Sequence, residues 1–133
     1  MIRYATYNDI DFWLSLDRHL SIHELNKKIN NKECLVILNN NEPIGILRYN
    51  LFWDNTPFVN MLYIKNEYQR MGYGKELMIF FENEMKKLGY DTIMTSTQID
   101  EDGKYFYYSL GYKHTGSIYL KNQAEELILI KEI

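Results

Sequence analysis

The sequence contains one cysteine, Cys34, and no cluster of histidines and cysteines at metal-ligand spacing. A single cysteine cannot form an internal disulfide, which fits a reducing cytoplasm. Cys34 lies in the apolar run CLVIL, where we expect a small buried hydrophobic residue rather than a nucleophile. His19 and His23 stand four residues apart, but Ser21 and Glu24 form a capping-box pattern that predicts a helix break between them. A structural metal is therefore not expected.

Long apolar runs and an excess of positive charge are also lacking. No hydrophobic stretch approaches the length of a membrane span. The N-terminus, MIRYATYNDID, has neither the basic head nor the apolar core of a signal peptide. The formal net charge is −3, and binding to nucleic acid phosphates usually needs a basic face. These features predict a cytoplasmic protein whose partners include neither nucleic acid nor membrane.

The apolar pattern predicts one mixed α/β domain. The 133 residues are enough for one hydrophobic core, so a single domain is expected over residues 1–133. Apolar and alternating segments predict strands at 2–6, 34–38, 43–53, 58–65, 91–97, 112–120 and 126–133. Helical spacing and caps predict helices at 9–20, from 21 onward, at 73–88 and at 101–110, the first of them capped by Asn8. The resulting order is β-α-α-β-β-β-α-β-α-β-β.

Residues 69–75, QRMGYGK, place two glycines at the mouth of a predicted helix. The stretch is not a P-loop, because Gln69 occupies the position of the first glycine and Glu76 replaces the hydroxyl residue. It is not a dinucleotide fingerprint either, because Leu77 stands where the third glycine should be. A helix N-terminus offers free N–H groups to an anion, and glycines allow a close approach. The alternative is that Gly72 and Gly74 only allow the chain to enter the helix.

Two motifs resemble the GNAT acyltransferases. The stretch from Gln69 to Gly74 resembles that family's acetyl-CoA loop, Gln/Arg-x-x-Gly-x-Gly/Ala. Downstream, YFYYSLGYK is similar to the family's FYEKLGF segment, with one helix and one strand between the two motifs. The resemblance covers essentially the whole chain. It implies a mostly antiparallel mixed sheet of six to seven strands, splayed at a central parallel pair and flanked by about four helices.

The resemblance implies which residues hold acetyl-CoA. The pantetheine arm would lie along the main chain of Leu62, Tyr63 and Ile64, and an N–H of this strand would polarise the thioester carbonyl. The pyrophosphate would be held by the loop that comprises Gln69, Arg70, Met71, Gly72, Tyr73, Gly74 and Lys75. Lys75 is equally consistent with a solvated helix residue. Asp100 stands where the family often has an asparagine that touches the pantetheine, although its simpler role is the N-cap of the next helix.

Tyr107 matches the family tyrosine that lies near the leaving sulfur, which implies a general acid. Gly111 sets this register, since Tyr105 and Tyr108 lie close by in the sequence. The alternative is that Tyr107 only packs a short helix. Ser96 and Thr97 lie at the end of the strand that faces the splayed pair. They are candidates for contact with substrate, and the alternative is that they are ordinary hydroxyl residues at a strand end.

Asn60 departs from the family pattern. Several members carry a glutamate at this position as general base, and an asparagine amide cannot hold a proton at neutral pH. The base is therefore unassigned, with Asp54, Glu101 or a histidine as candidates. Asn60, Asp54 and Trp53 are candidates for lining the acceptor pocket.

The sequence thus predicts an acetyl-CoA-dependent N-acetyltransferase that acts on a primary amine by direct attack in a ternary complex. The acceptor stays open between a small-molecule amine and a peptide or protein amine, and net acidity favours a cationic one. Two alternatives remain, a non-catalytic acyl-CoA sensor and an interaction module that uses only the fold. The C-terminal strands also leave a homodimer open.

Overall fold

The computed structural model describes residues 1–133, which form seven strands and four α-helices in the order expected from the sequence. The strands are β1 (Ile2–Tyr4), β2 (Cys34–Asn39), β3 (Glu42–Phe52), β4 (Thr56–Ile64), β5 (Thr92–Gln98), β6 (Lys113–Ile118) and β7 (Glu126–Glu132). The helices are α1 (Ile10–Leu16), α2 (Ile22–Asn30), α3 (Tyr73–Lys87) and α4 (Gly103–Ser109). The strand order is β1-β2-β3-β4-β5-β7-β6, and the parallel β4–β5 pair confirms the expected mixed sheet.

The chain forms two compact units. Residues Met1–Asn50 and Asn60–Phe81 make the first, and residues Leu51–Val59 and Glu82–Ile133 make the second. The single domain expected over residues 1–133 stays a prediction. None of the helices combines the length and apolar character needed to cross a membrane.

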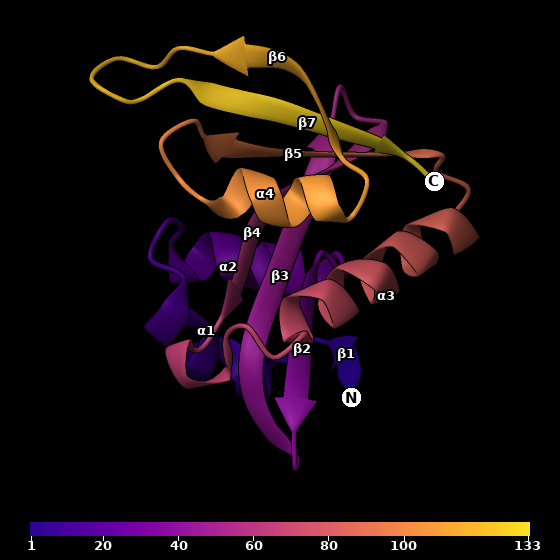
Figure 1. Ribbon diagram of the computed structural model, residues 1–133. Helices are drawn as coiled ribbons and strands as arrows, with labels where there is room; N and C mark the ends of the chain where they lie inside the picture. The colour runs from indigo at the N-terminus through magenta and orange to yellow at the C-terminus, as the bar shows by residue number, and fades with distance from the viewer. The chain divides into compact units, whose positions relative to one another are not determined.

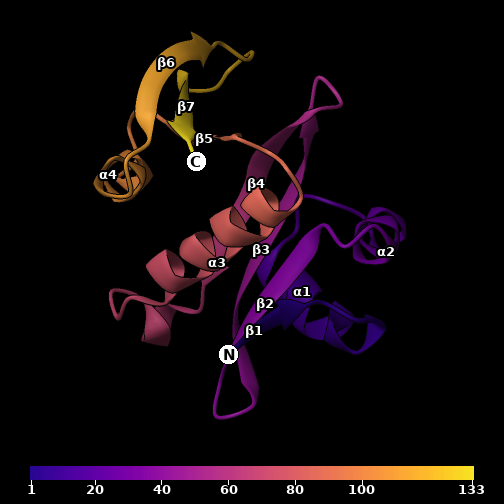
Figure 2. The ribbon, with the colours of Figure 1, turned by 90° about the vertical axis from the view of Figure 1, so that its right-hand side faces the viewer.

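In the first unit, α1 and α2 lie against the antiparallel strands β1, β2 and β3 (Figure 2). Trp13 and Leu25 from the two helices are fully buried against the alternate residues Cys34, Val36 and Leu38 of β2. Cys34 is 1% exposed, and burial raises the pKa of its thiol to about 12. The thiol is therefore protonated at neutral pH, which agrees with the predicted role as a small buried hydrophobic residue. Ser21 caps α2 by accepting a hydrogen bond from the Glu24 amide at 3.1 Å, which confirms the predicted break after His19.

A charged pair is buried beneath α1. The Asp17 carboxylate is fully buried and accepts hydrogen bonds from Arg48 Nε at 2.7 Å and from Trp13 Nε1 at 3.1 Å. Burial alone would favour the neutral acid, but the hydrogen bond and charge of Arg48 hold the pKa of Asp17 below its usual range. The side chains of α1 and β3 are thereby tied together inside the first unit.

Asn8 is not the cap of the first helix, which corrects the sequence prediction. A 3₁₀ turn at Tyr7–Asp9 precedes α1, and the Asp9 carboxylate accepts the Thr6 amide at 2.8 Å. The same carboxylate binds both terminal nitrogens of Arg3, at 2.7 and 3.0 Å. Asp9 can make both sets of bonds because it carries a charge, whereas the Asn8 amide cannot pair with Arg3 in this way.

In the second unit, β5, β7 and β6 run side by side and α4 lies along β5 (Figure 1). A network of polar side chains joins α3 to β7. The Glu82 carboxylate accepts a hydrogen bond from the Tyr112 hydroxyl at 2.7 Å and from Lys131 Nζ at 2.8 Å. The Tyr112 ring in turn meets the Tyr107 ring edge-on at 5.5 Å. This network fixes the helix that carries the predicted acid.

One local prediction in this unit is wrong. Asp102, not Asp100, occupies the N-cap position of α4, because the chain turns for two further residues after β5. Trp53, a candidate for lining the acceptor pocket, has a side chain that is 80% exposed. It lies with Asp54 in the β3–β4 turn, where both residues have positive φ (+55° and +63°) and no neighbouring strand covers them.

Candidate active site

The loop before α3 is held in shape by its own polar side chains. The Gln69 amide donates to the Ile64 carbonyl at 2.8 Å and to Asn66 Oδ1 at 3.2 Å. The Tyr63 hydroxyl donates to the same Asn66 oxygen at 3.0 Å. Gln69 and Asn66 therefore hold the start of the loop against the end of β4. The part of the loop that can contact a ligand is the main chain after Gln69.

The main chain at Gly72 has the conformation that a glycine allows. Its φ is +91°, and a Cβ built at this position would meet no atom of the protein within 4 Å. The glycine is thus needed for its backbone conformation, and the space beside it is open. The first helical amide bonded within the chain is that of Glu76, which donates to the Gly72 carbonyl at 3.0 Å. The N–H groups of Tyr73, Gly74 and Lys75 have no partner in the helix and form its positive end.

Two cationic side chains of the predicted loop are exposed near the start of α3. Arg70 also has positive φ (+61°), and the side chains of Arg70, Met71 and Lys75 are exposed. A cationic loop at a helix N-terminus suits an anion such as a pyrophosphate.

Strand β4 loses its parallel partner halfway along. The β4–β5 ladder has two pairs, Phe58 with Met94 and Val59 with Thr95. Beyond Val59, the main chain from Asn60 to Ile64 is unpaired on this edge, as expected for a splayed pair. Leu62 and Tyr63 are half-buried and Ile64 is buried. The N–H and C=O groups on this side of residues 60–64 therefore have no partner in β5.

Tyr107 lies in the second unit at the point where the parallel ladder ends. Its side chain is buried and its hydroxyl hydrogen-bonds to Thr95, while Thr95 Oγ1 donates to the Val59 carbonyl at 3.0 Å. Burial raises the pKa of Tyr107 to about 12, which keeps the phenol protonated. Tyr105 and Tyr108 are 61% and 39% exposed, so only Tyr107 of the three faces inward.

Sequence reasoning missed Thr95 and the Val59 carbonyl in this chain of hydrogen bonds. The two residues are 36 positions apart and meet only because β4 and β5 pair. A weak signal was present, since a buried hydroxyl in the apolar strand TIMTST needs a partner.

The remaining predicted residues lie at the surface. The Asn60 amide donates to Asn50 Oδ1 at 2.6 Å, and both side chains are exposed. Asp54, Asp100 and Glu101 are exposed as well. No group of three histidine, cysteine, aspartate or glutamate side chains is arranged to hold a metal ion.

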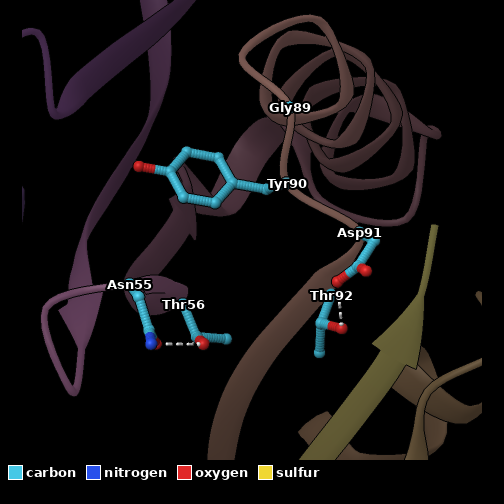
Figure 3. A pocket seen from close by; sticks show the side chains of 6 residues that line it. All are labelled: Asn55, Thr56, Gly89, Tyr90, Asp91 and Thr92. Atoms are coloured by element: carbon cyan, nitrogen blue, oxygen red, sulfur yellow. Dashed lines mark hydrogen bonds between the residues drawn. The ribbon is translucent and has the colours of Figure 1, made fainter.

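A pocket of about 280 Å³ opens elsewhere in the second unit, lined by Asn55, Thr56, Gly89, Tyr90, Asp91 and Thr92 (Figure 3). Two lining pairs are already bonded within themselves: Thr56 to Asn55 at 2.8 Å and Thr92 to Asp91 at 2.9 Å. The pocket lies at the amino ends of β4 and β5, whereas parallel strands usually bind ligands at their carboxyl ends. None of the predicted site residues lines it, and it is not a candidate for the reaction.

The model of the acetyltransferase (GNAT) family matches residues 3–112. The chain belongs to this family. That membership makes it an acetyltransferase, and it confirms the family expected from the motifs at 69–74 and 105–113. Comparison with curated protein sequences finds no matching relative.

Solved structures confirm the GNAT fold. Ard1 from Thermoplasma volcanium superposes with a TM-score of 0.85 at 16% identity, over 100% of this chain and 97% of the other. The ribosomal-protein-S18-alanine N-acetyltransferase of Escherichia coli gives 0.83 at 16% identity, over 100% and 93%. An aminoglycoside 6'-N-acetyltransferase solved with coenzyme A gives 0.81 at 16% identity, over 99% and 96%. At these identities the likeness concerns the fold.

Proposed function

We propose that this GNAT protein transfers the acetyl group of acetyl-CoA to a primary amine in a ternary complex. The observation that carries the proposal is the loop at Gly72. The space beside Gly72 is open, and the first amides of α3 have no partner in the helix. Loop amides would hold the pyrophosphate, and the free edge of β4 at Leu62–Ile64 would hold the pantetheine. Two CoA-bound relatives with the same fold support this assignment.

The proposed chemistry follows from the roles that the resemblance to the GNAT family gives to β4 and Tyr107. The amine nitrogen forms a bond to the thioester carbonyl carbon while a β4 N–H stabilises the oxygen as it becomes negative. The C–S bond then breaks and the thiolate takes the proton of the Tyr107 hydroxyl. The nitrogen releases its surplus proton to solvent, from which the phenolate regains one. Thr95 keeps the phenol in place between turnovers.

The proposal is tested by two measurements on the full chain. Calorimetry should detect acetyl-CoA binding, and a thiol-reactive dye should detect CoA release when a panel of primary amines is added. Failure to bind acetyl-CoA would overturn the proposal.

Substitution of Gly72 tests the loop directly. Gly72→Val should weaken acetyl-CoA binding by about 10–100-fold, because a β-branched residue cannot keep φ near +91° and the charge-assisted bonds from the amides are lost. Gly89→Val is the matched control, since Gly89 has φ of +96°, equally open surroundings and a position outside the loop. Equal affinity in the two variants, measured by calorimetry on folded protein, would refute the phosphate site. Lys75→Ala should have a smaller effect than Gly72→Val.

A second candidate function is a sensor that binds acyl-CoA without catalysis. The hydrogen bond between Asn60 and Asn50 favours it, because two neutral amides occupy the place where several relatives have a base. Acetyl-CoA binding without thiol release from any amine in the panel would favour the sensor over the transferase.

A further inference from the structure

The end of the β4–β5 ladder has two faces, and only one of them carries Tyr107. Side chains alternate along a strand, so Thr95 and Ser96 point to opposite faces of β5. Thr95 faces α4 and bonds to Tyr107. Ser96 is the first residue of β5 beyond the last parallel pair, and it points to the face away from α4.

Ser96 holds a carboxylate on that second face. Its hydroxyl donates to Glu126 Oε1 of the neighbouring strand β7 at 2.8 Å. The register places Ser96 opposite Ile128 and Glu126 opposite Gln98, so Ser96 and Glu126 are diagonal neighbours on one face. Gln98 is the last residue of β5, which puts the carboxylate at the carboxyl end of a parallel strand, where ligands usually bind.

Glu126 has no cation within the protein. Glu82 in the same unit is paired with Lys131 and Glu84 with Lys87, but no lysine, arginine or histidine lies within 4.0 Å of Glu126. The side chain is only half-buried, so one oxygen is fixed by Ser96 and the other can accept from a ligand. A fixed, accessible carboxylate attracts an ammonium group more strongly than a mobile one in bulk water, because less ordering is required.

We propose that Glu126, oriented by Ser96, binds the ammonium group of the acceptor on the face of the sheet opposite Tyr107. The acceptor is then a cationic amine, drawn to this carboxylate before one N–H proton passes to solvent and the nitrogen attacks the thioester. The inference rests on the proposed acetyl transfer and specifies its second substrate. It assigns a binding role to a residue in none of the recognised motifs.

The test compares Glu126→Gln with Glu132→Gln. Glu132 lies on the same strand and, six residues on, the same face, so it controls for a lost negative charge on β7. With spermidine, lysine amide and an unblocked tetrapeptide as probes, Glu126→Gln should raise KM for the amine about 10–100-fold, the usual worth of a hydrogen bond to a charged group. KM should rise with ionic strength in the wild type and much less in Glu126→Gln. Acetyl-CoA affinity should stay unchanged.

Further variants separate binding from folding. Glu126→Asp should recover part of the affinity because it keeps the charge, and Ser96→Ala should raise KM by less than Glu126→Gln. An unchanged amine KM in folded Glu126→Gln, or an equal rise in Glu132→Gln, overturns the role of Glu126 while acetyl transfer stands. If the wild type transfers nothing, the proposed function fails, and calorimetric binding of spermidine to the wild type and Glu126→Gln still decides whether this carboxylate is a cation site. Equal affinities would refute it.

Discussion

Tyr107→Phe is expected to lower the turnover number by about 10²–10⁴-fold, the usual worth of one positioned general acid. The hydroxyl is the only group removed, and it is the one that would protonate the departing thiolate. Because the pKa of Tyr107 is raised to about 12, the wild-type phenol carries its proton throughout the pH range of ordinary assays. Thiol release under saturating acetyl-CoA and amine measures the effect.

The Tyr107→Phe substitution should leave the packing around the ring unchanged. The ring contacts with Phe106 and Tyr112 remain, at 5.1 and 5.5 Å, and Thr95 still donates to the Val59 carbonyl. Acetyl-CoA affinity should therefore change little. Tyr105→Phe and Tyr108→Phe are matched controls on the same helix, and their exposed rings should leave the turnover number unaltered. If Tyr108→Phe is the damaging change, the motif register is off by one; if all three are silent, solvent protonates the thiolate.

Asp17→Asn is expected to lower the free energy of unfolding by about 3–5 kcal/mol, since it leaves the Arg48 guanidinium buried without its counter-charge. A domain of this size has about 5–15 kcal/mol in total, so the urea midpoint should fall markedly. Glu24→Gln is the control, because its partner Lys27 lies 3.4 Å away in an exposed pair that should contribute at most about 1 kcal/mol.

The pH dependence of the difference gives an independent check. The pKa of Asp17 is lowered in the folded protein, so its contribution is complete above the unfolded pKa and is lost as the pH falls through the folded one. Wild type and Asp17→Asn should thus converge in stability in acid. A constant difference at all pH values would mean that shape, rather than charge, accounts for the loss.

Local patterns in the sequence were sufficient to predict the succession of elements and the loop at Gly72. The reason is that the spacing of apolar residues, the capping residues and the glycines each determine the structure of only a few neighbouring residues. The register that singles out Tyr107 was predictable because Gly111 aligns the segment YFYYSLGYK with the motif that it resembles, and in the structure Tyr107 is the buried tyrosine of the three. The roles of the loop residues and of Tyr107 in binding and catalysis stay predictions.

Contacts between distant residues could not be predicted in the same way. Thr95 meets Val59 across 36 positions, Ser96 meets Glu126 across 30, and Arg48 meets Asp17 across 31. Each depends on strand register or on helix packing, which one sequence does not specify. The N-cap prediction at residue 8 failed for a local reason, because a 3₁₀ turn at Tyr7–Asp9 precedes α1 and Asp9 bonds to Arg3 only six positions away.

The Glu82–Tyr112–Lys131 network bears on how far the chain can be truncated from its C-terminus. The family match ends at residue 112, so β6 and β7 lie beyond the part of the chain that sequence similarity recognises. Lys131, on the last strand, nevertheless supplies the only cation that pairs with the buried Glu82. A fragment that ends at Tyr112 would retain the recognisable acetyltransferase motifs and lack the lysine that pairs with Glu82. The family match therefore ends two strands before the residues of this ion pair are complete.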